Sequence, residues 1–121
     1  MNKKELETYL GKWIKSWSGN EPQKLIKFYS ANAYFQDPLN PKGLTKKKEI
    51  EPYFKKLLAK NPNWEWEITE VIPNKKGCIV KTEAVVPHKK KKVKVSCVDI
   101  LEMKGKKIVR NEVYFDRSKL K

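Results

Sequence analysis

The stretch Trp64-Glu65-Trp66-Glu67-Ile68 decides the fold, because apolar and charged residues alternate strictly along it. Alternation with a period of two is typical of a strand with one buried face. Before residue 60 the apolar residues instead recur every three or four positions, as they do on amphipathic helices. The chain therefore changes from mostly helical to strand at this stretch, which predicts an α+β domain.

Three helices are expected before this point. The first carries one continuous apolar stripe, formed by Leu6, Tyr9, Leu10, Trp13, Ile14 and Trp17. Asn20 is expected to cap a second helix that ends near Asn32. Thr45 is expected to cap a third helix running to about Lys60, with Pro52 either kinking it or marking its first turn.

One short strand is expected between the second and third helices, and four strands after the third. The four later strands are predicted at 64–72, 78–86, 93–104 and 108–116, with turns between them. The order is thus α-α-β-α-β-β-β-β, with three helices packed on a curved, mostly antiparallel sheet. A chain of 121 residues is long enough to bury one core, so a single domain over 1–121 is expected.

The composition argues against several classes of protein. No apolar stretch reaches the length of a membrane span, and the N-terminus lacks the apolar core of a signal peptide. Cys78 and Cys97 lie in separate expected strands and are predicted to be reduced and buried, which fits a cytoplasmic protein. A single histidine, His88, and scattered carboxylates predict no metal site. No glycine-rich loop indicates a cofactor.

The net charge of +14 raises the question of a polyanionic partner. Nearly all basic residues are lysines, and the two arginines are Arg110 and Arg117. Arginine is preferred for bidentate phosphate and base recognition, so the pattern favours a solvated surface over a nucleic-acid groove. Lysine clusters at 46–48 and 89–92 leave polyanion binding as an alternative.

Asp37 ends the short expected strand, just before Pro38, and shares a strand face with Phe35. A carboxylate among aromatic side chains is costly to ionise, which suits a group that transfers protons. The same position also suits an aspartate that begins a turn, here over 37–43. Both roles remain open from the residues alone.

Six runs of the chain resemble, in order and spacing, the nuclear transport factor 2-like superfamily, in particular its SnoaL-like branch. This superfamily also contains ketosteroid isomerase and limonene epoxide hydrolase. The runs are 13–20, 28–33, 35–38, 43 with 48–50, 98–102 and 107–116. The resemblance implies a cone-shaped α+β fold whose sheet wraps around a pocket, and a homodimer formed through the outer face of the sheet.

The resemblance also assigns roles to two aspartates. Asp37 falls where ketosteroid isomerase has its general base, and Asp99 falls where that enzyme keeps a protonated aspartic acid that donates to the oxyanion. Asp99 has a structural alternative, in which a buried hydrogen-bond partner simply satisfies its carboxyl group. Two departures argue against the reactions of these two enzymes. Trp13 stands at the position of the isomerase's tyrosine donor, which argues against steroid isomerisation, and Cys97 stands at the position of the arginine of limonene epoxide hydrolase, which argues against epoxide hydrolysis.

The family arrangement further predicts which side chains line the pocket. Besides Asp37 and Asp99, the expected site residues are Trp13, Phe35, Tyr53, Phe54, Trp66, Cys97, Asn111 and Val113. Trp17 is expected in the core instead. Glu112 and Tyr114 alternate with Asn111 and Val113 and are expected to face a partner subunit.

The expected function is that of a SnoaL-like pocket protein for an apolar small molecule. If it is an enzyme, we expect cofactor-free proton transfer of the isomerase, cyclase or dehydratase type. Asp37 would be the base, with Asp99 and the Trp13 indole N–H as donors. The alternatives are a non-catalytic ligand-binding or accessory dimerisation domain, and a lysine-rich polyanion-binding module. The sequence leaves open whether the chain is an enzyme at all.

Overall fold

The computed structural model describes residues 1–120, and it begins with the long helix α1 (Lys3–Ser18). A capping box starts this helix: the Asn2 side chain accepts from Glu5 N at 2.8 Å, and the Glu5 side chain accepts from Asn2 N at 3.3 Å. Gly19 forms the C-cap. The apolar stripe predicted for this helix faces inward, and Leu10 and Trp13 are almost completely buried.

The second helix is shorter than the sequence predicts. Helix α2 (Pro22–Leu25) continues as the 3-10 helix η1 (Ile26–Phe28), and strand β1 (Tyr29–Asp37) follows at once. The expected end near Asn32 is therefore wrong, because Tyr29 already occupies a fully buried strand position. The predicted N-cap, Asn20, has a φ of 56° and instead donates its Nδ2 to Leu58 O at 2.7 Å.

One short strand was not expected. The chain reverses after Asp37 and forms β2 (Asn40–Thr45), which pairs antiparallel with β1, before helix α3 (Lys47–Lys60). Lys46 rather than Thr45 is the N-cap residue of α3, and Thr45 N donates to the Glu49 side chain at 3.0 Å. Pro52 lies inside α3 without ending it.

The remaining strands form the larger part of one six-stranded sheet. They are β3 (Glu65–Pro73), β4 (Gly77–His88), β5 (Lys91–Lys104) and β6 (Lys107–Phe115), and the sheet order is β2-β1-β6-β5-β4-β3. Every neighbouring pair is antiparallel except β1 and β6. A short 3-10 helix, η2 (Ser118–Leu120), follows β6. The predicted α+β cone is confirmed, with β2 as the addition.

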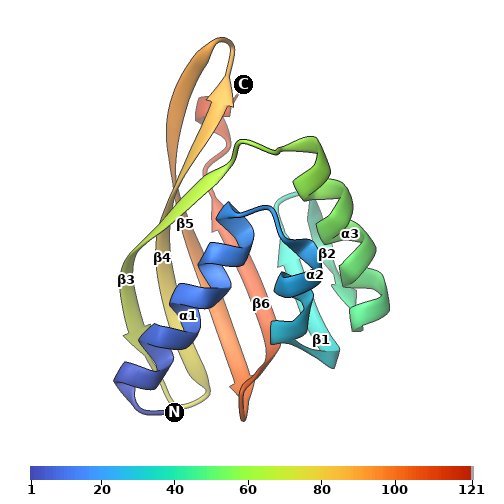
Figure 1. Ribbon diagram of the computed structural model, residues 1–121, viewed down its shortest axis with the longest axis vertical. Coiled ribbons are helices and arrows are strands. Elements are labelled where there is room, and N and C mark those ends of the chain that lie inside the picture. Colours follow the sequence, from blue (N-terminus) through green and yellow to red (C-terminus); the bar gives the residue numbers. More distant parts are fainter. Residues whose placement is uncertain (121) are drawn as a thin grey trace.

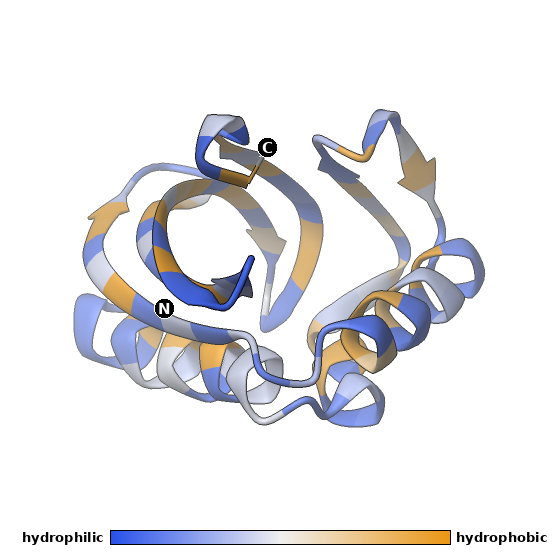
Figure 2. Ribbon diagram, turned by 90° about the horizontal axis from the view of Figure 1, so that it is seen from above, coloured by the Kyte–Doolittle hydropathy of each residue, from blue (hydrophilic) through white to orange (hydrophobic). Residues whose placement is uncertain are grey.

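The helices cover one face of the sheet, which curves toward them (Figures 1 and 2). Helix α1 packs against β3, and α3 packs against β1. Strand residues alternate between hydrophobic and hydrophilic over much of the sheet, as Figure 2 shows, so the concave face supplies the core. The outer face mixes charged side chains with half-buried aliphatic ones, such as the opposed Ile79 and Ile100. No helix within residues 1–120 has the length and apolar character needed to cross a membrane.

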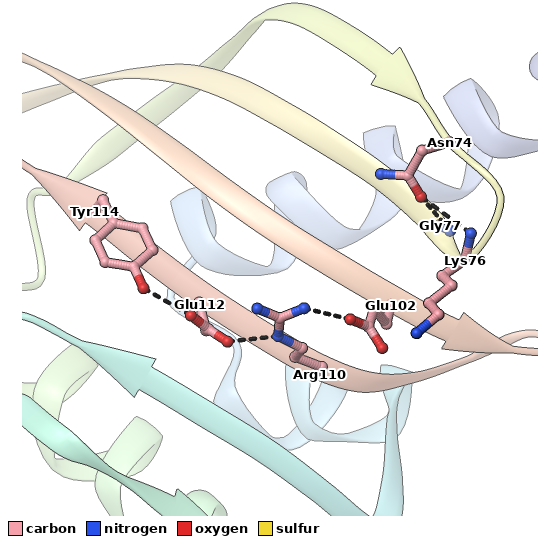
Figure 3. A network of polar contacts seen from close by, with 7 residues as sticks. All are labelled: Asn74, Lys76, Gly77, Glu102, Arg110, Glu112 and Tyr114. Carbon is pink, nitrogen blue, oxygen red and sulfur yellow. Dashed lines mark hydrogen bonds and ion pairs between the residues drawn. The ribbon is translucent and has the colours of Figure 1, made fainter.

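The outer face of the sheet carries a chain of polar contacts along β6 (Figure 3). Arg110 forms ion pairs with Glu102 of β5 and with Glu112, and the Tyr114 hydroxyl donates to Glu112 at 2.6 Å. Hydrogen bonds from Arg110 and Tyr114 lower the pKa of Glu112. Alternation along β6 thus separates these outward side chains from Asn111 and Val113 on the inner face.

Candidate functional site

A cavity of about 80 Å³ lies between the helices and the concave face of the sheet. Helix α1 contributes Trp13, Ile14 and Trp17, and α3 contributes Leu57. The sheet and its connections contribute the other lining residues, which are Phe35, Asp37, Leu39, Trp64, Trp66, Thr82, Cys97, Asp99, Val113 and Phe115. The wall is therefore mostly aromatic and aliphatic, with a few polar groups, as is usual for small-molecule sites.

Most of the site residues predicted from the sequence meet at this cavity. Those that line it are Trp13, Phe35, Asp37, Trp66, Cys97, Asp99 and Val113. The other three lie behind the wall: Tyr53 contacts Asp37, Asn111 contacts Asp99, and Phe54 is fully buried against the ring of Phe35.

Several lining residues are not among the ten predicted site residues. Trp17 was expected only in the core, but it both packs on Phe54 and lines the cavity. Trp64, Thr82 and Phe115 also line it. The period of two could have found Trp64 and Phe115, because they lie two residues from Trp66 and Val113 on the same faces. Leu57 carried the helical signal, since it lies four residues after Tyr53 on the inward face predicted for the third helix, whereas Leu39 carried no comparable signal.

The Asp37 carboxylate is built into the reversal between β1 and β2. Its Oδ1 accepts from Leu39 N at 3.1 Å, from Asn40 N at 2.9 Å and from Asn40 Nδ2 at 2.9 Å. Its Oδ2 accepts from the Tyr53 hydroxyl at 2.5 Å. The turn role that the sequence left open is thus realised at Oδ1, while Oδ2 is bound to α3. Burial, together with the bond to Asp37, raises the pKa of Tyr53, so Tyr53 remains a donor.

Asp99 is placed differently, on β5 in the middle of the concave face. Asn111 Nδ2 donates to its Oδ2 at 2.9 Å, and no other side chain within residues 1–120 donates to this carboxyl group. Burial raises the pKa of Asp99 to about 7, and the hydrogen bond from Asn111 opposes part of this rise. Asp99 therefore changes protonation state near neutral pH while it faces the cavity.

A buried chain of hydrogen bonds supports Asn111 from behind. The Trp13 indole donates to the Tyr29 hydroxyl at 3.1 Å, and that hydroxyl donates to Asn111 Oδ1 at 2.7 Å. The expectation that the Trp13 N–H donates to a substrate is therefore wrong, because Tyr29 already accepts it. The chain fixes which end of the Asn111 amide faces Asp99.

The two cysteines are free and buried, as the sequence predicts. Burial first, and the nearby Asp99 second, raise the pKa of Cys97 to about 11, so its thiol stays protonated at neutral pH. The thiol contacts Val95 O at 3.8 Å. Within residues 1–120 no group of three or more histidine, cysteine or acidic side chains is placed to hold a metal ion.

A family model of the SnoaL-like domain matches residues 10–111, which include all ten predicted site residues except Val113. The chain belongs to the SnoaL-like family. A search among curated proteins finds no match.

Solved structures share the fold of this SnoaL-like domain at low sequence identity. A hypothetical protein with a ketosteroid isomerase-like fold from Catenulispora acidiphila, in complex with trimethylamine, has a TM-score of 0.80 at 17% identity, covering 93% of this chain and 88% of that one. A SnoaL-like protein of unknown function from Burkholderia thailandensis has a TM-score of 0.81 at 10% identity, and the match covers 96% of this chain and 98% of that one. SalBIII is an epoxide hydrolase/cyclase-like enzyme with a role in pyran ring formation in the polyether salinomycin. It has a TM-score of 0.80 at 14% identity, and the match covers 95% of this chain and 93% of that one.

Proposed function

We propose that this SnoaL-like domain binds a small molecule with a largely apolar surface and exchanges a proton with it through Asp99, without a cofactor. The observation that carries the proposal is a carboxyl group in an apolar cavity with a pKa near 7. A group of this kind can both accept and release a proton at neutral pH, which is the requirement for general acid–base catalysis. The reaction class is isomerisation, cyclisation or dehydration.

The roles of the two aspartates differ from those implied by the resemblance. Asp37 was expected to be the base, but both of its oxygens already accept hydrogen bonds from the turn and from Tyr53. Oδ1 already accepts three hydrogen bonds, and Oδ2 keeps a single acceptor site beside the Tyr53 hydroxyl. Asp99 keeps one oxygen without a side-chain donor within residues 1–120, so we assign the proton transfer to Asp99. We assign to Asp37 a different role, in which its carboxylate shapes the cavity and contributes negative charge to it.

The fold neighbours support a small-molecule pocket in two ways. One of them was solved with trimethylamine, and another is an enzyme of ring formation. Because these identities are low, the likeness supports the architecture, and the chemistry depends on the cavity itself.

A carbon-13 NMR titration of the aspartate carboxyls tests the proposal directly. The chain has three aspartates, Asp37, Asp99 and Asp116, so three Asn variants assign the signals. The proposal requires the Asp99 carboxyl to titrate near pH 7. Titration of Asp99 near the ordinary aspartate value of about 3.9 would remove the acid–base account.

A non-catalytic ligand carrier is the alternative use of the same cavity. Once a ligand is known, Asp99→Asn separates the two functions. Loss of turnover with binding retained identifies an enzyme, whereas a protein that binds the ligand and turns over none of it is a carrier.

We also propose that the protein is a cytoplasmic homodimer that pairs through the outer face of its sheet. Tyr114 on this face is 46% exposed, and tyrosine is enriched in protein interfaces. The free cysteines support a reducing compartment. Sedimentation analysis of the wild type and Tyr114→Lys tests the pairing: the wild type should sediment as a dimer and the variant as a monomer.

A lysine groove favours polyanion binding as a second candidate function. It lies between α1, the α2–η1 segment and the β5–β6 turn, and Glu21 is the one acidic residue in its described lining. Its basic lining residues are Lys12, Lys15, Lys24, Lys27, Lys106 and Lys107. Among these six lysines, only Lys24 forms an ion pair with a carboxylate within residues 1–120, and its Nζ lies 2.7 Å from Glu21 Oε2. The clusters at 46–48 and 89–92 lie elsewhere, at the start of α3 and in the β4–β5 turn. Binding of inorganic polyphosphate that weakens steeply with salt, and that Lys15→Gln with Lys107→Gln reduces, would support this function.

A further inference from the structure

The cavity has the opposite charge to the rest of the protein. The chain has 28 lysines and arginines against 14 acidic residues, but the described lining includes Asp37 and Asp99 and no lysine, arginine or histidine. Both carboxyl groups are less than 10% exposed. Exposed lysines are screened by salt over about 10 Å, whereas charges at a buried apolar wall are screened much less. A cation inside the cavity therefore experiences the carboxylates more strongly than the surface lysines.

All four tryptophans of the chain line this cavity. The rings of Trp17 and Trp66 are 5.5 Å apart at 54°, and those of Trp64 and Trp66 are 5.3 Å apart at 83°. Rings inclined in this way form adjoining walls rather than a stack. Tryptophan is the best aromatic partner for a cation, and walls of this kind recognise alkylated ammonium groups.

The lining of the cavity also includes a threonine whose hydroxyl is buried with at most a weak partner. The Thr82 hydroxyl is the single buried side-chain nitrogen or oxygen within residues 1–120 that makes no hydrogen bond. Thr82 is 3% exposed and lies opposite Cys97 across β4 and β5, and its contact with the Cys97 thiol, a weak hydrogen-bond partner, lowers the pKa of that thiol. A buried hydroxyl whose best partner is a thiol is poorly compensated, so a ligand oxygen that bonds to it recovers free energy.

We infer that the cavity binds a small alkylated ammonium ion that carries a hydroxyl or carbonyl group. The alkyl groups pack on the tryptophans, Asp99 and Asp37 balance the positive charge, and Thr82 bonds to the ligand oxygen. This inference rests on the proposed function, because it concerns the same cavity, and it specifies the charge and the chemical class of the ligand. A neutral apolar molecule would leave the negative charge of the two carboxylates unbalanced and the Thr82 hydroxyl without a ligand oxygen.

Choline and 3,3-dimethylbutan-1-ol provide a matched pair of probes, because they share shape and hydroxyl group and differ in charge. Isothermal titration calorimetry should show choline binding at least ten-fold more tightly than the neutral alcohol. Asp99→Asn should weaken choline binding at least ten-fold and leave the alcohol nearly unchanged. Asp116→Asn, which changes an exposed aspartate outside the cavity, should alter neither affinity.

A second variant removes the aromatic wall without removing charge. Trp64→Leu keeps an apolar side chain but no ring face, and it should reduce the preference for choline over the alcohol. Equal affinities for choline and the alcohol in the wild type, or no choline binding, overturn the inference. The proposed proton transfer is judged separately, by whether the Asp99 carboxyl titrates near pH 7, so the two failures are distinguishable.

Discussion

Asn111 Nδ2 donates to Asp99 Oδ2 across 2.9 Å, inside the concave face of the sheet, where Asn111 is fully buried. The two residues lie on neighbouring strands, β5 and β6. One neutral donor is weak compensation for a buried carboxylate, which is why the pKa of Asp99 remains about 7. The site thus keeps a group that is unfavourable for folding in its ionised form.

This cost predicts a dependence of stability on pH. The pKa of Asp99 rises from 3.8 to about 7 on folding, so the folded state holds the proton more tightly than the unfolded chain. Its contribution to stability is therefore greatest below about pH 4 and declines as the pH rises to about 7. Asp99→Asn removes this decline. The unfolding free energy of the variant minus that of the wild type should therefore increase by roughly 3 kcal/mol from pH 5 to pH 8.

Urea denaturation at several pH values measures this difference. Asp116→Asn is the control, because Asp116 is exposed and does not line the cavity. Its difference from the wild type should change much less between pH 5 and pH 8 than that of Asp99→Asn. A constant offset between Asp99→Asn and the wild type from pH 5 to pH 8 would contradict the prediction.

Asn111→Leu should raise the pKa of Asp99 above about 7. The variant removes the donor that favours the ionised carboxylate, and it also leaves the Tyr29 hydroxyl without its acceptor. We expect a loss of about 1–3 kcal/mol in unfolding free energy from the unpaired buried groups. Carbon-13 NMR of the Asp99 carboxyl measures the shift.

Tyr29→Phe is the matched control for this shift. It removes the hydroxyl that bonds to Asn111 Oδ1 but keeps the Asn111 donor to Asp99. It should destabilise the protein while the Asp99 carboxyl titrates close to its wild-type midpoint. If the midpoint of Asp99 moves in neither variant, burial alone, and not the Asn111 bond, sets the titration of Asp99.

Tyr53→Phe should destabilise the protein through Asp37. The Tyr53 hydroxyl donates to Oδ2 at 2.5 Å, and hydrogen bonds to charged groups are worth about 1.5–3 kcal/mol. Tyr34→Phe is the control, because the Tyr34 hydroxyl donates to the neutral Gln36 side chain at 2.6 Å and should cost about 1 kcal/mol. Chemical denaturation of the two variants gives the comparison, and similar losses would argue against an ionised Asp37.

The sequence predicts this fold well because most elements repeat a clear hydrophobic period. The helix α1 stripe and the alternation in β3–β6 each bury one face, so their type and order follow from the pattern. Residues 29–32 were wrongly given to a helix, since only tertiary burial of Tyr29 in the sheet separates helix from strand there. Strand β2 carries no alternation at all, and its pattern includes Pro41 and Gly43.

The candidate site is less predictable than the fold, for a physical reason. Which residues face the cavity follows from strand phase, so Asp99 and Val113 could be placed in advance. Hydrogen-bond partners depend on distances between side chains remote in sequence, such as Trp13 to Tyr29 and Asn111 to Asp99. Sequence alone therefore located both aspartates, but it could not show that Asp37 is bound by its turn.

Gly43 explains why β2 can pair with β1, and it gives a last prediction. Its φ is +81°, and a Cβ there would lie 2.3 Å from Tyr34 Cε1. Gly105 also has a positive φ, +60°, but a Cβ there meets nothing within 4 Å. Gly105→Ala should therefore cost only the backbone strain of about 1–2 kcal/mol, and Gly43→Ala about 2 kcal/mol more. Thermal or urea unfolding measures both.

The extra cost should come from the Tyr34 ring, which a double variant can test. In a Tyr34→Ala background the clash is absent, so Gly43→Ala should then cost about as much as Gly105→Ala does. The Tyr34 ring must otherwise move and give up its bond to Gln36, which lies on the β1 edge where β2 pairs. If Gly43→Ala costs the same with and without Tyr34, the backbone conformation alone makes glycine necessary at this position.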